Sequence, residues 1–196
     1  YYNSKHLGTF GHCSILSFNG NKIITTGGGG AILTSNRKFH KLVNHISTTA
    51  KIKHQYIFSH DQHGFNYRLP NLNCALGLTQ VKKLGKILKS KKKLHNAYTD
   101  SFKNANYLKV YNSCSDRNKN FSNHWLNIAI LNKKFEHLRN KIIENSMKNK
   151  VQVRPSWETM HSIKYLRGFP KMNLQNSISF NRRVICLPSS PDYFYK

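Results

Sequence analysis

The sequence of 196 residues predicts an α/β fold. Short apolar runs typical of strands alternate with segments whose apolar residues recur at helical spacing. One helical segment is much longer than the others and separates two regions of alternating elements. A chain of this length can form one domain or two small ones. We therefore expect a first α/β region, a long connecting helix, and a second, smaller α/β or α+β lobe.

The first region is predicted to contain two short strands, a helix and a long loop. Residues 13–18 and 31–34 are apolar, strand-like runs. Residues 35–36 are typical of a helix N-cap, and apolar side chains recur at helical spacing across residues 38–46. Residues 47–69 lack periodicity, and a structured loop of this length is usually functional.

The long helix is predicted at residues 70–103, with Pro70 suited to its first turn and a kink near Gly85. The patterns after it predict a strand at 107–111, a polar loop at 112–120, a strand at 125–131, an amphipathic helix around 135–143, a short strand at 151–155 and a final helix at 178–185.

The net charge of +25 comes from 32 Lys and Arg against 7 Asp and Glu. Such a charge is typical of proteins that bind nucleic acid or anionic membranes. The lysines, however, are spread along the chain, with one dense run at residues 89–93, and no nucleic-acid-binding motif accompanies them. The chain is also rich in Asn and Ile, as an AT-biased genome would produce. We therefore attribute the charge to composition and predict neither a nucleic-acid nor a membrane partner.

The four cysteines, Cys13, Cys74, Cys114 and Cys186, are far apart and never in CxxC spacing. We therefore expect no metal site, and predict reduced, buried, inert thiols in a cytoplasmic protein. No apolar run has the length of a membrane-spanning helix. The chain begins at Tyr1 and opens directly into motif-like sequence, and we expect it to be a piece of a longer chain.

Lys22 has the most distinctive surroundings of any lysine in the chain. It follows the strand-like run at 13–18 and precedes Thr25, Thr26 and the four glycines Gly27–Gly30. A nucleophilic lysine needs a fixed position and a lowered pKa, and a tight loop between two strands provides the fixed position. The glycines could let backbone N–H groups approach a phosphate. The string matches neither GxGxxG nor a Walker pattern, however, and fits a flexible turn equally well.

Two further clusters combine polar and aromatic side chains. Asn66, Tyr67 and Arg68 stand just before the long helix, where side-chain donors and a helix N-terminus would together bind an anion. A loop that merely caps the helix is an equal alternative. Arg154 and Trp157 could hold a phosphate and stack on a ring or base.

Residues 17–30 read SFNGNKIITTGGGG, and residues 66–70 read NYRLP. Together with the later RPSW and LPSSP strings, they resemble the DegT/StrS sugar aminotransferases, which are pyridoxal-phosphate (PLP) enzymes of fold type I, the aspartate-aminotransferase fold. The similar subgroup aminates nucleotide-linked 4-keto-6-deoxy sugars in the bacillosamine, legionaminic acid and perosamine routes. The resemblance covers nearly the whole chain. It implies a fragment that holds part of the large domain plus the small C-terminal domain.

The resemblance also implies a role for each site residue. Lys22 would bind the cofactor, pyridoxal 5′-phosphate, and carry the proton between the amino donor's Cα and the cofactor. Ser17 would hydrogen-bond the cofactor phosphate. Asn66 would reach the phosphate of the neighbouring subunit's cofactor, so a homodimer would share its active sites. The residues that would contact substrate are Arg68, at the glutamate carboxylate, Tyr67 nearby, and Arg154 and Trp157 in the sugar-nucleotide pocket.

The implied activity is transfer of an amino group from L-glutamate to the C4 keto group of a UDP- or GDP-linked 4-keto-6-deoxy sugar, in surface-glycan biosynthesis. The implied domains are residues 1–69 of the large domain with its Schiff-base lysine, the connecting helix at 70–104, and the small domain at 105–196. Family members are much longer, and the missing N-terminal half would carry the aspartate that pairs with the pyridine nitrogen. We therefore expect the isolated chain to be inactive.

Three alternatives are compatible with the sequence. A family enzyme that dehydrates its sugar at C3 is disfavoured by Lys22, because those relatives have histidine in its place. A basic nucleic-acid-binding module would retain a salt-dependent affinity for nucleic acid after Lys22→Ala. The third alternative is an inactive, truncated remnant of the enzyme.

Overall fold

The computed structural model describes residues 1–112 and 119–191 and divides into two compact units. The described residues of unit 1 are 1–85 and 119–121, and those of unit 2 are 86–112 and 122–191. Most of the polar loop predicted at 112–120, together with Cys114, lies outside the described residues. None of the helices in the described part of the chain has the length and apolar character needed to cross a membrane.

Unit 1 opens with the short 3₁₀ helix η1 (Leu7–Thr9), followed by strands β1 (Ser14–Ser17) and β2 (Gly30–Leu33), which pair antiparallel. Helix α1 (Arg37–Ser47) comes next. The Asn36 side chain caps α1 by accepting hydrogen bonds from two backbone N–H groups of the first turn, both at 3.0 Å. These elements confirm the two strands, the helix and the N-cap predicted for this region.

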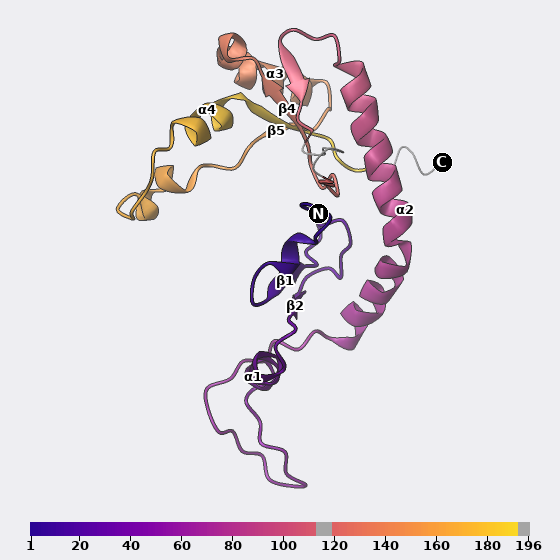
Figure 1. The fold of residues 1–196 in the computed structure, drawn as a ribbon, viewed down its shortest axis with the longest axis vertical. Coiled ribbons are helices and arrows are strands. Elements are labelled where there is room, and N and C mark those ends of the chain that lie inside the picture. The colour runs from indigo at the N-terminus through magenta and orange to yellow at the C-terminus, as the bar shows by residue number, and fades with distance from the viewer. Residues whose placement is uncertain (113–118, 192–196) are drawn as a thin grey trace. The chain divides into compact units, whose positions relative to one another are not determined.

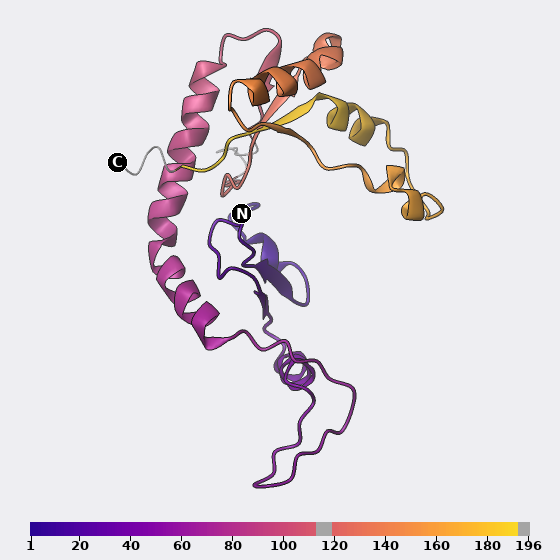
Figure 2. The ribbon, with the colours of Figure 1, turned by 180° about the vertical axis from the view of Figure 1, so that it is seen from behind.

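The predicted long loop is confirmed between α1 and α2. Figures 1 and 2 both show it extending away from α1 before it returns to the start of α2. Its returning segment lies against the end of α1, because the Phe65 N–H donates to the Ile46 carbonyl oxygen at 2.7 Å. Gly64 is required for this close approach, since a Cβ there would lie 2.4 Å from the carbonyl carbon of Thr49.

Helix α2 (Asn71–Ser101) confirms the long helix predicted from the sequence. It begins directly after Pro70, whose missing N–H is not needed at a helix start. The helix continues through Gly85, which is also the last residue of the first segment of unit 1.

Unit 2 contains a four-stranded antiparallel sheet in the order β3-β4-β6-β5. The strands are β3 (Leu108–Val110), β4 (Asn127–Leu131), β5 (Arg154–Pro155) and β6 (Val184–Leu187). The core consists of Leu131, Val153 and Ile185, and two residues of α3, Ile142 and Ile143, pack against it.

The helices of unit 2 flank this sheet. Helix α3 (Arg139–Lys148) contacts β5 and β6, and α4 (Gln175–Arg183) contacts β4. Figure 2 shows the connection between β5 and α4 running out from the sheet and back. The 3₁₀ helices are η2 (Lys133–Leu138), which leads into α3, and η3 (Met160–Ser162) and η4 (Lys164–Leu166) in that connection.

Two predicted elements of unit 2 are wrong in part. The final helix predicted at 178–185 ends at Arg183, and the apolar run Val184–Leu187 forms strand β6 instead. This run is rich in β-branched residues and is held by pairing with β4, which sequence periodicity cannot reveal. The short strand predicted at 151–155 is restricted to Arg154–Pro155, because only these two residues pair with β6.

The cysteines in the described residues are free thiols. Cys13 and Cys186 are half-buried, and burial raises the pKa of the Cys186 thiol. The expectation of a buried thiol is wrong for Cys74, which is exposed on α2.

Two buried histidines stack in unit 2. The rings of His95 on α2 and His124 before β4 lie 4.1 Å apart, with 24° between their planes. The Nδ1 atom of His95 lies 3.0 Å from Asn127 Oδ1. Burial, followed by the charges of His95, Lys92 and Lys91, lowers the pKa of His124 from 6.5 to about 4. His124 is therefore neutral in the folded protein at neutral pH.

We expect unit 2 to lose stability as the pH falls from about 6.5 towards 4. In this window the unfolded state takes up a proton at His124 that the folded state excludes, which lowers the free energy of unfolding by up to ~1.4 kcal/mol per pH unit. Urea unfolding at pH 7, 6 and 5 measures the loss through fluorescence of the two tryptophans, Trp125 and Trp157, both in unit 2. His124→Gln should flatten this dependence, and an unchanged slope in that variant would contradict the prediction.

Candidate active site

The loop that carries Lys22 joins β1 to β2. Ser17, the last residue of β1, pairs with Gly30, the first residue of β2. One step further into the loop, the Phe18 N–H donates to the Gly29 carbonyl oxygen at 3.0 Å. The Lys22 N–H donates to the Asn19 carbonyl oxygen at 3.0 Å and so closes a turn. Lys22 is therefore held in a turn between two paired strands, five residues after the Ser17 hydroxyl.

Two threonines organise the base of this loop. The Thr25 hydroxyl donates to the Phe18 carbonyl oxygen at 2.9 Å, and the Thr26 N–H donates to the same oxygen at 3.0 Å. The Thr26 hydroxyl also donates to the Gly28 carbonyl oxygen. Gly27 and Gly29 have φ of 80° and 85°, a conformation that favours glycine. The glycine string is therefore an ordered turn with specific backbone requirements.

Helix α2 anchors the same loop. The Asn73 Nδ2 group donates to the Thr26 carbonyl oxygen at 2.5 Å, and Thr26 is buried. A Cβ at Gly77 would lie 2.8 Å from Thr26 Cγ2, so a glycine lets the helix approach the loop closely. Sequence reasoning assigned no role to Asn73, because its contact depends on how the first turn of α2 folds against a loop 47 residues earlier.

Replacing Asn73 with alanine is expected to loosen the lysine loop. The substitution leaves the buried Thr26 carbonyl without this donor, which costs about 1–3 kcal/mol. Hydrogen exchange at the amides of residues 25–29 should become faster. Asn96→Ala, at an exposed position of the same helix, is the matched control and should leave these amides unchanged. Equal exchange rates in both variants would contradict an anchoring role.

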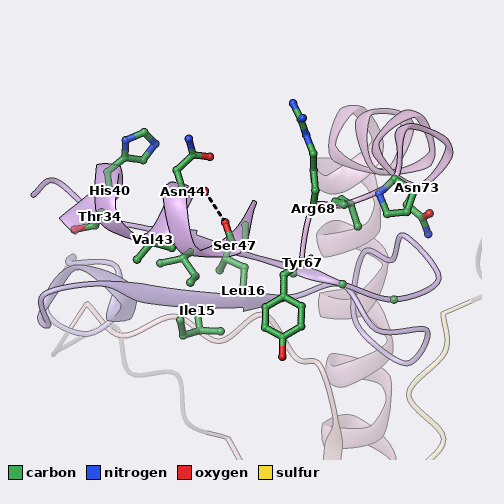
Figure 3. Close-up of a pocket in the computed structure, with 17 residues that line it drawn as sticks. Ile15, Leu16, Thr34, His40, Val43, Asn44, Ser47, Tyr67, Arg68 and Asn73 are labelled. Atoms are coloured by element: carbon green, nitrogen blue, oxygen red, sulfur yellow. Dashed lines mark hydrogen bonds between the residues drawn. The ribbon is translucent and has the colours of Figure 1, made fainter. Parts of the chain in front are cut away.

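A groove of about 760 Å³ lies beside the loop and is shown in Figure 3. Gly28–Gly30 line it together with residues of β1, β2 and α1 and with Tyr67, Arg68 and Asn73. Figure 3 shows the Arg68 and Tyr67 side chains pointing in opposite directions from the same short segment. Both residues line the groove, but their side chains do not converge on a single ligand position.

The remaining predicted residues lie elsewhere. Ser17, Lys22 and Asn66 are not among the residues that line the groove. Asn66 is exposed in the returning segment of the long loop, where it pairs with Thr48. Arg154 and Trp157 belong to unit 2. Trp157 stacks on Trp125 with ring centroids 6.3 Å apart, and Arg154 is exposed on β5.

The loop combines two chemical functions. A primary amine held on an ordered loop can attack a carbonyl carbon. Hydroxyl groups and turn N–H groups beside it can bind a phosphate. An amine at Lys22 and a hydroxyl at Ser17 therefore suit a phosphorylated aldehyde, whereas the Gly27 N–H already donates to Thr25 Oγ1 at 2.9 Å.

Comparison with known proteins identifies a family that matches nearly the whole chain. The model of the DegT/DnrJ/EryC1/StrS aminotransferase family matches residues 1–194. The chain is 30% identical over 195 residues to the GDP-perosamine synthase of Vibrio cholerae, a match that covers 96% of this chain and 50% of the relative. The chain thus spans about half the length of this relative.

Solved structures show the same fold. Helicobacter pylori PseC, an aminotransferase involved in the biosynthesis of pseudoaminic acid, superposes with a TM-score of 0.89 at 24% identity. The match covers 98% of this chain and 52% of PseC. The E. coli GDP-4-keto-6-deoxy-D-mannose-3-dehydratase with bound hydrated PLP superposes with a TM-score of 0.82 at 22% identity, over 97% of this chain and 53% of the dehydratase. The predicted fold class is confirmed: the chain has the α/β fold of about half of a fold type I PLP enzyme.

Proposed function

Because the chain belongs to the DegT/DnrJ/EryC1/StrS aminotransferase family, we propose that it provides the lysine-bearing part of the active site of a nucleotide-sugar aminotransferase. The cofactor is pyridoxal 5′-phosphate. The observation that carries the proposal is Lys22 itself: its turn lies between two paired strands and is anchored to α2 through Thr26 and Asn73.

The residues of the loop fit this cofactor. The Lys22 amine would hold its aldehyde carbon, and the Ser17 hydroxyl would donate a hydrogen bond to its phosphate. When bound, the cofactor supplies an electron sink for the charge left when the donor's Cα loses a proton. Lys22 is the base that would remove this proton from the donor's Cα and deliver it to the cofactor. The ordered threonine and glycine turn keeps the amine in place.

On the substrate side, we assign L-glutamate as donor and a UDP- or GDP-linked 4-keto-6-deoxy sugar as acceptor, aminated at C4 for surface-glycan biosynthesis. Arg68, with Tyr67 beside it, would bind the glutamate carboxylate. Arg154 and Trp157 would shape the sugar-nucleotide pocket, and the exposed Trp157 ring suits stacking on a base. Asn66, exposed on the long loop, would reach the cofactor phosphate of a second subunit in a homodimer.

The proposed domain organisation follows the family. Residues 1–69 would belong to the large cofactor-binding domain, and residues 105–196 would form the small domain. Residues 70–104 would form the helix that connects the two domains. The free thiols of Cys13, Cys74 and Cys186 suit a cytoplasmic location. Since the chain spans about half the length of its relative from Vibrio cholerae, we propose that it is inactive in isolation.

Lys22 also distinguishes the proposed function from two alternative functions. A C3-dehydratase of the family would not use lysine at this position. A nucleic-acid-binding module would have no need for a lysine turn anchored at its base by Thr25, Thr26 and Asn73.

Reductive trapping tests the proposal. The protein to use is a chimera in which this chain replaces the matched half of the Vibrio cholerae synthase. After incubation with pyridoxal phosphate and borohydride, peptide mapping should find the label on Lys22. Lys41→Ala, at an exposed lysine of α1, is the control and should label normally. A label on another lysine, or an unchanged label in Lys22→Ala, would refute the assignment.

A further inference from the structure

Trp157 and Trp125 form an aromatic pair in unit 2. Their ring centroids lie 6.3 Å apart with 26° between the ring planes, and Trp157 remains 67% exposed. Trp125 is held through its backbone, because its N–H donates to Asn123 Oδ1 at 3.0 Å and its carbonyl oxygen accepts from the Lys91 ammonium group at 3.2 Å. Trp125 therefore supports one side of the Trp157 ring, and the exposed part of Trp157 is available to a planar ligand.

Asn181 of α4 anchors the segment that carries Trp157. Its Nδ2 group donates to the Ser156 hydroxyl oxygen and to the Trp157 carbonyl oxygen, both at 2.7 Å. These two hydrogen bonds use both N–H donors of the amide. The pairing of β5 with β6 ends at Pro155 and does not reach Trp157. The Asn181 amide therefore fixes the backbone at Trp157 where strand pairing no longer does.

Asn181 is itself fixed in position. Arg139, the first residue of α3, donates through Nη1 to the Asn181 carbonyl oxygen at 2.8 Å. At the end of α4, Arg183 donates through Nη1 to the Leu131 carbonyl oxygen of β4 at 3.2 Å. The amide therefore projects from a helix that is joined both to α3 and to a core strand, and a side chain on such a rigid element holds its partner within a narrow range of positions.

We infer that Asn181 is a positioning residue for nucleotide binding: it holds Trp157 where the exposed ring can stack on the base of the sugar nucleotide. This role rests on the nucleotide-binding function proposed for Trp157. Without the Asn181 amide, the segment samples other orientations, and the affinity falls in proportion to the fraction of molecules whose ring is correctly placed. Asn181 acts on the nucleotide only through Trp157, so its effect should disappear when the Trp157 ring is absent.

Circular dichroism tests the positioning without any ligand. Trp125 and Trp157 are the two tryptophans of the 196-residue chain, so the exciton couplet of their stacked indoles reports their mutual orientation. Asn181→Ala should lose most of the couplet but remain folded, because the bond from Arg139 goes to the backbone and alanine favours a helix. Asn176→Ala, at an exposed position of the same helix, is the matched control and should keep the couplet. An unchanged couplet in Asn181→Ala would overturn the inference.

Calorimetric titration with GDP and UDP tests the effect on binding, in the chimera with the Vibrio cholerae half. Asn181→Ala and Trp157→Ala should each weaken binding of the preferred nucleotide about tenfold. Ser156→Ala keeps the bond to the Trp157 carbonyl oxygen and should bind within about twofold of the parent chimera. In the double variant, Asn181→Ala should add nothing to the loss caused by Trp157→Ala.

Three binding results would overturn the inference. The first is normal affinity in Asn181→Ala alongside weak binding by Trp157→Ala, which would leave the role of Trp157 intact. The second is unchanged affinity in Trp157→Ala, or no binding of either nucleotide by the parent chimera. This result would also contradict the proposed role of Trp157, but it would not affect the labelling of Lys22. The third is additive losses in the double variant, which would show that Asn181 acts on the fold of unit 2 and not through the Trp157 ring.

Discussion

Replacing Lys22 with alanine is expected to lower the rate of amino transfer by about 10³-fold or more, because in the proposed function one substitution removes both the covalent attachment of the cofactor and the base. The measurement is glutamate-dependent amination of a GDP-linked 4-keto-6-deoxy sugar by the chimera with the Vibrio cholerae half. The structure supports a large effect because the Lys22 turn is closed by its own backbone hydrogen bond and lies on a loop tied to α2.

Two control variants distinguish the loss of the Lys22 amine from the loss of a positive charge. Lys22→Arg keeps the positive charge but removes the amine that bonds to an aldehyde, so it should be as inactive as Lys22→Ala. Lys41→Ala removes a positive charge from the exposed surface of α1 and should retain activity. Near-normal turnover by Lys22→Arg would show that charge alone is needed, and would exclude the covalent role.

The elements that the sequence predicted well are determined by local interactions. Asn36 caps α1 through hydrogen bonds to the next turn, and α2 follows a helical repeat that begins after Pro70. Both signals lie within a few residues of the structure that they produce. Lys22 could be singled out for the same reason, since its threonine and glycine neighbours lie on one loop between adjacent strands, whereas Ser17 was assigned from the resemblance to the family.

The elements that the sequence did not predict depend on partners that are distant in the sequence. Val184–Leu187 follows a helix directly and has no turn signal before it, and only pairing of Ile185 with Ala129 identifies a strand. Asn73 anchors the lysine loop by reaching Thr26 across 47 positions of sequence. The exposure of Ile15 and Ile32 on the β1–β2 ribbon is likewise a property of the folded unit, because the apolar runs alone predict short buried strands.

Replacing Leu131 with alanine is expected to lower the free energy of unfolding of unit 2 by about 2–5 kcal/mol, the range for removing a large side chain from a packed core. Leu131 is 1% exposed on β4, and it packs with Val153, from the segment before β5, and with Ile185 of β6. Because the sheet fixes these neighbours, they cannot collapse fully into the space, and the effect should lie near the upper end.

Urea unfolding at pH 7, followed by tryptophan fluorescence, measures this loss, since Trp125 and Trp157 both report on unit 2. Met172→Ala removes a large side chain from an 89% exposed position of unit 2 and should change the free energy by no more than about 0.5 kcal/mol. A loss below about 1 kcal/mol in Leu131→Ala would contradict a tightly packed core. A large loss would show that unit 2 has a packed core of its own.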